Sequence, residues 1–481
     1  MQKLALAFSL CTLALWAAPV IAPSGIRNAA SYSDPAFLNG AIAQGSLFVI
    51  FGSGMGPDAT VNVMVNGTTL ACSVLYASDG QIAVVMPVDA PAGTGNLVVS
   101  SGGESASSPI TVVEASPGIF TTNQQGTGPG IIQDADGNQN ALTMAFNPGQ
   151  TVVAWATGLG TASGAAVTAF VQGQSATVVY AGPSRDSGVD QVNITLPNGV
   201  AGCYVPLYIV ATLPDGPPVA SNFVTISIAP DGSFCTDDNF PDVTSSAGYY
   251  TGNVTLTAST NGASATGAFV VYSPTALATV GSFGFMDIPD GNCGVMQSNG
   301  GGAGPAPTYL DAGPTLNISG PNGARQMAKS NGTYSAGLPA NYLVPGGYAI
   351  TNGNGGADVG DFELDITMPP AFTWTEAASI STIVRSQPLA ITWSGGDPNG
   401  RVQIAGTSIA DPDLNASVSF LCIAKGSDLH FTVPAAILSL LPGAGGSLTV
   451  SSTTSVTGAV SGLQNLTGSV AYSFSAGVYF P

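Results

Sequence analysis

The sequence predicts an all-β protein: tandem immunoglobulin-like β-sandwiches followed by a C-terminal β-rich domain. A repeated motif is the first observation. GSLFVIFGSGMGP (Gly45–Pro57) and GQTVVAWATGLG (Gly149–Gly160) each lead a short apolar run into a Gly-x-Gly turn. Such short runs of β-branched and aromatic residues favour buried strands, and glycine tolerates the positive φ of the turn. The second observation is a series of short alternating segments between turn residues, which is typical of a sandwich.

The repeat continues downstream of both motifs. Gln81-Ile82 in the first copy corresponds to Gln191-Val192 in the second. The longer matches are Val61–Gly67 with Ala169–Gly173, Ala71–Tyr76 with Ala176–Tyr180, Gly93–Val99 with Gly202–Val210, and Ser108–Val113 with Ser221–Ile226. Strands repeated together with their turns indicate a duplicated module. We therefore expect module 1 at residues 23–115 and module 2 at residues 116–235.

The composition excludes several classes of partner. Only 7% of the 481 residues are charged, against ~25% in ordinary soluble domains, while 45% are hydrophobic. The net charge is −19, from 8 Lys+Arg against 27 Asp+Glu. We therefore expect no nucleic-acid binding and no electrostatic attachment to anionic membranes. Most carboxylates lack a cationic partner, so they are either solvated or placed around a cation such as Ca²⁺.

The first 22 residues have the pattern of a secretory signal peptide. Lys3 is followed by the apolar stretch Leu4–Ala17 and by small residues up to Ala22. A membrane anchor is the alternative, but the stretch is short for a bilayer span, and no later segment is long and apolar enough. We therefore expect a secreted or cell-surface protein.

Secretion permits disulfides. Cys203 and Cys235 flank the last strands of module 2, and we expect them to pair. Cys293 and Cys422 would then link parts of the C-terminal region, which leaves Cys72 as a buried free thiol. Because no Cys-x-x-Cys occurs, zinc and redox motifs are absent from the sequence.

The remainder of the chain does not visibly repeat the modules. TDDNFPD (Thr236–Asp242) is polar and acidic, as expected of a linker at residues 236–243. Residues 244–481 alternate as strands do, for example at Val254, Leu256 and Ala258 before an Asn-Gly turn. We therefore expect a C-terminal β-sandwich-like domain, with Ala435–Leu441 as its best helix candidate.

The motifs resemble known families. In both copies the pattern GSLFVIFGSGMGP…VNG…A…Y…QI…P…G…V resembles the IPT/TIG immunoglobulin-like domain. Residues Asn28–Cys235, with NAAS, SPGIF, TGLG, YAGP, QVN and SNFVTI, resemble a family of uncharacterised secreted acidobacterial proteins, the Solibacter-type domain. The resemblance implies an extracellular immunoglobulin-like fold. It implies no established activity and no catalytic residue.

Few residues suit catalysis. His430, the single histidine, lies in LHFTVP at a strand position, so a histidine-dependent hydrolase or metal site is not expected. Asp134–Asn140 (DADGNQN) has the look of a calcium loop but lacks the distant glutamate of an EF-hand, so we interpret it as a hairpin turn.

The densest acidic group is Asp361, Glu363 and Asp365, with Asp358 just before it. Strand alternation places the first three on one face, where like charges repel and a cation would relieve the repulsion. The row is most simply a solvated outer face. The functional alternatives are a Ca²⁺ site and, less in keeping with one strand, a glycosidase carboxylate pair.

Three tryptophans could form a sugar-stacking platform, although such residues more often fill a core. Trp155 lies inside the repeated apolar strand, and we expect it in the core. Trp374 and Trp393 remain open between core and platform.

Taken together, these patterns favour a non-enzymatic extracellular binding, adhesion or surface-structural protein with an unknown protein or glycan partner and no cofactor other than a possible Ca²⁺. A carbohydrate-active protein, either a glycan-binding module or a weak glycosidase using C-terminal carboxylates, is the alternative.

Overall fold

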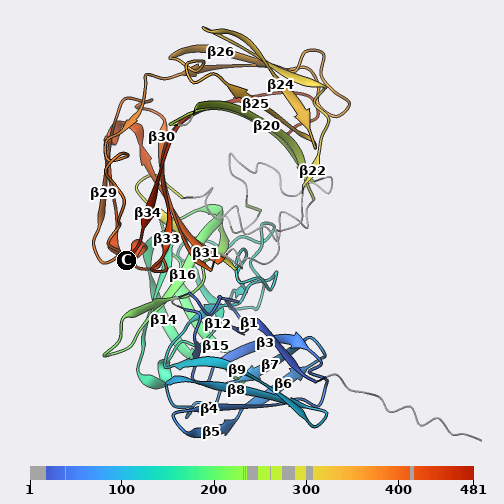
Figure 1. Cartoon of the computed structure of the whole chain (residues 1–481), viewed down its shortest axis with the longest axis vertical. Coiled ribbons are helices and arrows are strands. Elements are labelled where there is room, and N and C mark those ends of the chain that lie inside the picture. Colours follow the sequence, from blue (N-terminus) through green and yellow to red (C-terminus); the bar gives the residue numbers. More distant parts are fainter. Residues whose placement is uncertain are drawn as a thin grey trace, which may run out of the picture.

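The computed structural model describes residues 18–37, 39–230, 232, 234–235, 248–260, 262–273, 288–299, 307–411 and 416–481. Figure 1 shows three β-structured bodies in succession, with the first (blue) at one end and the third (yellow to red) at the other. β-Strands dominate the described residues, and the only α-helix among them is the short α2 (Ala435–Leu438). The prediction of an all-β fold with immunoglobulin-like sandwiches is confirmed. The predicted linker and residues 1–17 of the predicted signal peptide lie outside the described residues.

Module 1 is a sandwich of two sheets with its core between them. One sheet has the order β1 (Val20–Asn28), β3 (Leu47–Ser53), β7 (Gln81–Val85), β6 (Ser73–Ala77). The other has the order β2 (Ile42–Ala43), β9 (Glu104–Val113), β8 (Gly93–Ser101), β4 (Thr60–Val65), β5 (Thr68–Ala71). The repeated apolar run forms the inner strand β3, in which Phe48 and Ile50 are fully buried.

Module 2 repeats this strand order. Its first half is β10 (Gly118–Ile119) and β11 (Ile132–Gln133), both beside β12 (Thr151–Thr157), then β15 (Asp190–Thr195) and β14 (Gln174–Pro183). Its second half is β14, β13 (Ala166–Val171), β16 (Gly202–Thr212), with β17 (Pro218–Ala220) and β18 (Val224–Ile228) beside β16. The single long strand β14 occupies in module 2 the positions that β5 and β6 occupy in the two sheets of module 1.

The duplication extends to a β-bulge. The register of β6 against β7 shifts between Val74 and Tyr76, and that of β14 against β15 shifts between Val178 and Tyr180. A bulge inserts one unpaired residue and bends its strand. The same strand is therefore bent at the same place in both modules.

Both Gly-x-Gly turns have the backbone conformation that the sequence predicts. Gly54 and Gly56 have φ of +68° and +60°, and Gly158 and Gly160 have +75° and +70°. The residue between the glycines, Met55 in module 1, is fully buried, as is its counterpart in module 2. Each turn thus places an apolar side chain in the core while the backbone reverses.

The modules meet at the Gly-x-Gly turn of module 2. Ser116 N–H donates to Gly158 O at 2.9 Å. Leu47 N–H donates to Gly188 O at 3.2 Å and to Thr157 Oγ1 at 2.8 Å. The bonds from Leu47 of module 1 to Gly188 and Thr157 of module 2, beside the bond made by the boundary residue Ser116, hold the two sandwiches in one orientation.

Replacing Gly158 by alanine is expected to destabilise this joint. Its φ is +75°, and a Cβ there would lie 2.4 Å from Ser116 O, so a clash adds to the strain of a left-handed conformation. Gly137→Ala is the matched control, because its φ is +84° but its Cβ would meet nothing within 4 Å. By urea denaturation we expect losses of about 2–3 kcal/mol and about 1 kcal/mol in the free energy of unfolding. Equal losses would contradict a tightly packed joint.

The third body is built on one continuous 13-stranded sheet. Its order is β21 (Cys293–Asn299), β31 (Ala416–Lys425), β30 (Arg401–Asp411), β33 (Gly445–Gly458), β34 (Asn465–Tyr479), β19 (Tyr249–Ser259), β20 (Gly262–Tyr272), β25 (Thr333–Leu338), β24 (Gly323–Ser330), β23 (Thr315–Gly320), β26 (Gly346–Thr351), β27 (Glu363–Met368), with β22 (Thr308–Tyr309) also on β20. A small sheet of β28 (Thr373–Trp374), β29 (Leu389–Ser394) and β32 (His430–Val433) accompanies it.

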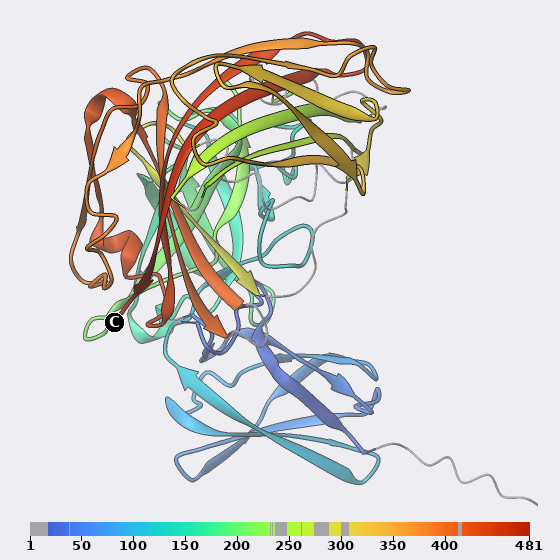
Figure 2. The ribbon, with the colours of Figure 1, turned by 45° about the horizontal axis from the view of Figure 1, so that its top comes forward.

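The large sheet bends back on itself. Figure 2 shows the long strands β33 and β34 (red) running from the lower part of this body into its arched upper part. Leu364 of β27 lies against Gly458 of β33 and Gly468 of β34, where no side chain stands between them. β34 pairs with β33 antiparallel and with β19 parallel, so two segments far apart in sequence lie side by side in mid-sheet.

Module 2 and the third body share a core. Tyr208 of β16 stacks on Phe170 with ring centroids 4.9 Å apart and lies 4.3 Å from Phe223. Tyr208 and Phe223 belong to the same buried cluster as Val295 of β21. The two bodies are therefore packed together through apolar surface.

Hydrogen bonds between neutral polar side chains connect neighbouring segments of this chain, which has few charged residues. Buried Asn222 accepts a hydrogen bond from Ile119 N–H at 2.7 Å and donates to Ile119 O and Gly126 O, each at 2.9 Å. Hydroxyl pairs bridge adjacent strands: Ser100–Ser105, Thr151–Thr195, Thr407–Ser419, Thr449–Ser475, Ser451–Ser473 and Ser455–Ser469. These bonds pair the polar groups of strands that carry few charges.

The structure also bears on the N-terminal boundary. β1 begins at Val20, inside the segment assigned to the signal peptide, and Val20 pairs with Ser53. Pairing resumes after an irregularity at Ile26, opposite Ile50. Cleavage after Ala22 would therefore remove the first paired part of β1.

Candidate functional site

The predicted calcium ligands form a row and not a cage. Asp361, Glu363 and Asp365 are exposed along the outer face at β27, and the apolar side chains between them are buried, as the alternation predicts. Ca²⁺ needs 6–8 oxygens converging at 2.3–2.6 Å, whereas alternate side chains of a strand stand roughly 7 Å apart. No group of three or more His, Cys, Asp or Glu side chains in the described ranges could hold a metal ion. The structure does not bring the three predicted ligands together.

The segment Asp134–Asn140 forms a hairpin turn. The Asp134 carboxylate accepts hydrogen bonds from Asp136 N–H at 3.0 Å, Asn138 N–H at 2.9 Å and Asn138 Nδ2 at 2.9 Å. The hydrogen bond from the Asn138 side chain is the main reason that the pKa of Asp134 lies below its usual value. The Asp134 carboxylate therefore stabilises the turn to which it belongs.

His430 is an exposed strand residue. It begins β32, and its Nδ1 lies 2.8 Å from Asp428 O. It belongs to no group of three or more possible metal ligands among the described residues.

Trp374 and Trp393 are both buried, with 2% and 3% of their surface exposed. They face each other across β28 and β29, and their indole N–H groups donate to Glu376 Oε2 at 2.9 Å and to Gly426 O at 3.1 Å. A sugar ring cannot stack on a buried indole. The possibility that these two form a binding platform is therefore wrong.

Glu376 is the acidic residue that accepts the hydrogen bond from Trp374, and both of its carboxylate oxygens accept hydrogen bonds. Besides Trp374 Nε1, it accepts hydrogen bonds from Thr392 N–H at 3.1 Å and from the Thr392 hydroxyl. A carboxylate that holds two strands together in this way is structural. It offers no support for a glycosidase pair in this domain.

A half-buried carboxylate supports the Gly-x-Gly turn of module 2. Asp190 accepts a hydrogen bond from Leu159 N–H at 3.0 Å, and desolvation raises its pKa in spite of that bond. In module 1, Asp79 accepts from Gly54 N–H at 3.1 Å. The two acids have the same structural task in both copies.

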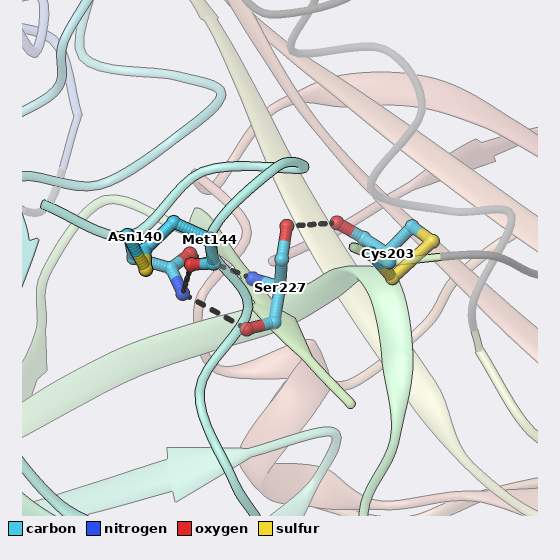
Figure 3. Close-up of a disulfide and its surroundings, with 5 residues drawn as sticks. Asn140, Met144, Cys203 and Ser227 are labelled. Atoms are coloured by element: carbon cyan, nitrogen blue, oxygen red, sulfur yellow. Dashed lines mark hydrogen bonds between the residues drawn. A yellow bond between two sulfur atoms is a disulfide. The ribbon is translucent and has the colours of Figure 1, made fainter. Parts of the chain in front are cut away.

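Both predicted disulfides are present. Cys203–Cys235 joins the end of module 2 with Cα atoms 5.3 Å apart, and Cys293–Cys422 joins directly opposed residues of β21 and β31. Figure 3 shows the first bond beside a polar network, in which Ser227 Oγ donates to Cys203 O at 2.8 Å. In the same network Asn140 Nδ2 donates to Ser227 O at 2.9 Å.

Cys72 is free and buried at the break between β5 and β6. Burial raises the pKa of its thiol to about 11, so the reactive thiolate is scarce at pH 8. We expect iodoacetamide to leave Cys72 unlabelled in the folded protein and to label it in guanidinium, as measured by mass spectrometry. Equal labelling rates in the two states would contradict its burial.

The feature that the sequence interpretation missed is a pair of exposed apolar side chains at each bulge. Leu75 and Tyr76 on β6 are 53% and 56% exposed, and Val179 and Tyr180 on β14 are 63% and 42% exposed. In a regular strand, successive side chains point to opposite faces of the sheet, so one residue of each pair would face the core. The bulge turns both outward, and only the repeated shift in register identifies it.

Trp155 lies outside the core, contrary to our prediction. Val152, Ala154 and Ala156 of β12 point into the core and are fully buried, so Trp155 points to the opposite face and is half-buried. Its indole N–H donates to Gln133 Oε1 at 2.7 Å. Although the residues of this run are apolar, only alternate ones face the core, and Trp155 lies on the other face of the strand.

Trp155 shares that outer face with polar residues of the next two strands. Trp155 is paired with Gln191 of β15, and Asn193 of β15 is paired with Tyr180 of β14. Val192 and Ile194 are fully buried, so the residues that alternate with them face outward. We call Gln133, Trp155, Tyr180, Gln191 and Asn193 the module 2 platform.

No protein-family model and no curated protein matches the chain. Among solved structures, it is 12% identical to the Bacteroides ovatus mixed-linkage glucan utilisation protein SGBP-B in complex with a heptasaccharide, with a TM-score of 0.23 over 39% of this chain. The chain spans 45% of that structure's length. It is 11% identical to the Sidekick-1 immunoglobulin domains 1–4, with a TM-score of 0.14 over 92% of this chain and 96% of that one. These TM-scores are far too low to argue from, so the fold class rests on the strand pairing described above.

None of the helices in the described ranges has the length and apolar character needed to cross a bilayer.

Proposed function

We propose that this chain is a non-enzymatic extracellular binding protein that uses the bulged edges of its two modules. The repeated exposure of Leu75-Tyr76 and Val179-Tyr180 at equivalent bulges carries the proposal. Single exposed apolar residues are ordinary. A pair repeated at the same place in both copies is better explained by recognition. It lies on β6 at a sheet edge, and on the part of β14 that pairs only with β15 among the described strands.

The acidic groups support the non-enzymatic part of the proposal. Asp79, Asp134, Asp190 and Glu376 each accept hydrogen bonds from neighbouring residues. Such groups are already committed to turns and strands, whereas a catalytic acid or base must be within reach of a substrate proton. Two disulfides, together with the signal-like first segment, support an extracellular location.

Cosedimentation tests the proposal. Purified protein is mixed with washed producing cells, and the bound fraction is compared with that of the Leu75→Ser/Val179→Ser variant. We expect the variant to lose at least three-quarters of the binding. Val88→Ser is the matched control, because Val88 is 71% exposed but lies at neither bulge, and it should bind as the wild type does.

Two results would contradict the proposal. A wild-type protein that stays entirely in the supernatant would exclude cell-surface binding. Release of reducing ends from polysaccharides above the level of heat-denatured protein would contradict its non-enzymatic character.

A further inference from the structure

We infer that the module 2 platform binds neutral polysaccharide; this inference rests on the proposed binding function and names the partner for one of its two edges. The platform combines a half-buried indole, an exposed phenol ring and three amide side chains on one face of β11, β12, β15 and β14. The faces of sugar rings carry C–H groups that pack on aromatic rings, and their hydroxyls both donate and accept hydrogen bonds.

The rings are spaced for an extended ligand. Trp155 lies on β12 and Tyr180 on β14, two strands apart and one outward-facing row apart. With strands ~4.8 Å apart and ~3.3 Å per residue, their Cα atoms are roughly 12 Å apart. A sugar chain can thus place one ring on each aromatic side chain, with the amides of Gln191 and Asn193 lying between them.

The rings are also held in position. Trp155 Nε1 donates to Gln133 Oε1 at 2.7 Å, and the Tyr180 hydroxyl donates to Pro183 O at 2.8 Å. Gly182 lies under the phenol, because a Cβ there would be 3.0 Å from Tyr180 Oη. Rings that are fixed before binding lose little conformational entropy on contact with a ligand.

The amides have hydrogen-bonding capacity to spare. Gln191 Nε2 donates to Asn193 Oδ1 at 2.7 Å. Within the described residues this leaves Gln191 Oε1 as an acceptor and the amino groups of Asn193 and Gln133 as donors. A sugar hydroxyl satisfies either type, whereas an apolar protein surface would desolvate all three without compensation.

The charge distribution selects a neutral ligand. All five platform residues are uncharged. Along their strands, charged residues come at Asp134 after β11, at Asp190 at the start of β15, and at Arg185 and Asp186 after β14. The Asp190 carboxylate accepts a hydrogen bond from Leu159 N–H in the Gly-x-Gly turn. A cationic ligand would find no carboxylate on the face, and an anionic polymer would meet a chain of net charge −19.

Module 1 provides an internal control. At the corresponding places it has Phe51 opposite Gln81, and Tyr76 opposite Ala83. The amide pair is missing because Ala83 replaces the asparagine, and the Phe51 ring lies 6.1 Å from that of Tyr32. The module 1 face therefore retains exposed tyrosine but not the polar groups that orient a sugar.

Affinity electrophoresis of the full chain in native gels tests the inference. Hydroxyethylcellulose and dextran are the neutral probes, and carboxymethylcellulose is the anionic partner of the first. We expect one or both neutral probes to retard the wild-type chain, carboxymethylcellulose to have little effect, and Trp155→Ala and Tyr180→Ala each to weaken retardation at least tenfold. Tyr479→Ala should behave as the wild type does, because Tyr479 is 52% exposed but lies on β34, outside both modules. Trp155→Phe should retain part of the binding. Thermal midpoints within about 2 °C of wild type show that the variants are folded.

The inference is overturned if neither neutral probe retards the wild type, if carboxymethylcellulose retards it as strongly as hydroxyethylcellulose does, or if both alanine variants bind as the wild type does. One combination of results separates the two proposals. If neither neutral probe retards the wild type, but Trp155→Ala and Tyr180→Ala still sediment with cells as the wild type does, then the proposed binding function is retained and glycan binding is excluded. A wild-type chain that binds a neutral probe but not cells retains the glycan site and loses the cell-surface role.

Discussion

Replacing Cys293 and Cys422 by alanine should lower the free energy of unfolding of the C-terminal body by about 5 kcal/mol. The two cysteines are 129 residues apart in sequence, and the entropy that a cross-link removes from the unfolded chain grows with the loop it closes. The bond also attaches β21, which lies at the edge of the large sheet and pairs there only with β31 among the described strands. Guanidinium unfolding followed by tryptophan fluorescence measures the loss, because Trp374 and Trp393 lie in this body.

The second disulfide provides the comparison. Cys203 and Cys235 are 32 residues apart, so the same relation gives about 4 kcal/mol for their replacement. Cys72→Ala is the control, since it removes a cysteine without a cross-link and should cost about 1 kcal/mol. If the shorter loop costs more than the longer one, chain entropy is not the main contribution of these bonds.

Replacing Arg27 by methionine should cost about 3–5 kcal/mol, because it leaves a buried carboxylate without its counterion. Arg27 donates to Asp34 Oδ2 at 3.1 Å, and only 1% of the Asp34 side-chain surface is exposed. The same guanidinium donates to Ser24 O at 2.9 Å and to Tyr32 O at 3.1 Å. It therefore holds the segment that leads from β1 towards β2, and urea denaturation should show the loss.

Arg401→Met is the matched control for that prediction. Arg401 pairs with Asp290, but 58% of its side chain is exposed, and such surface pairs contribute about 0–1 kcal/mol. The double variant Arg27→Met/Asp34→Asn should recover part of the loss by removing the buried charge. A single variant as stable as Arg401→Met would contradict a structural role for the Arg27–Asp34 pair.

Local patterns predicted the features that depend on local chemistry. The positive φ of Gly54 and Gly158 could be predicted because the turns require a left-handed backbone conformation, which glycine adopts most easily. The cysteine pairs could be predicted from the positions of the cysteines around strands. The reason that Trp155 was misplaced is also local. In the apolar run around it, small alanines mark the inner face, and hydrophobicity alone does not distinguish them from the large outer side chain.

Features that depend on partners distant in sequence could not be predicted. The buried pair Trp374–Trp393 depends on the register of β28 against β29, and the module 2 platform depends on the register of β15 against β14. The bulges that expose Leu75 and Val179 are one-residue shifts in register against the neighbouring strand. The alternation of residues within one strand does not reveal such a shift. The row at Asp361–Asp365 was placed on the correct face, but convergence on a cation requires residues from other strands.

The parallel contact between β19 and β34 affects how the protein is made. A ribosome releases Tyr249–Ser259 some 200 residues before Asn465–Tyr479, and the two must then lie side by side. Modules 1 and 2 draw their strands from nearby sequence and can fold while synthesis continues, but the last body must wait. Until then the edges of β19 and β33 are open, and open edges invite pairing with other chains. A truncation before residue 465 should therefore aggregate through this body while leaving both modules folded.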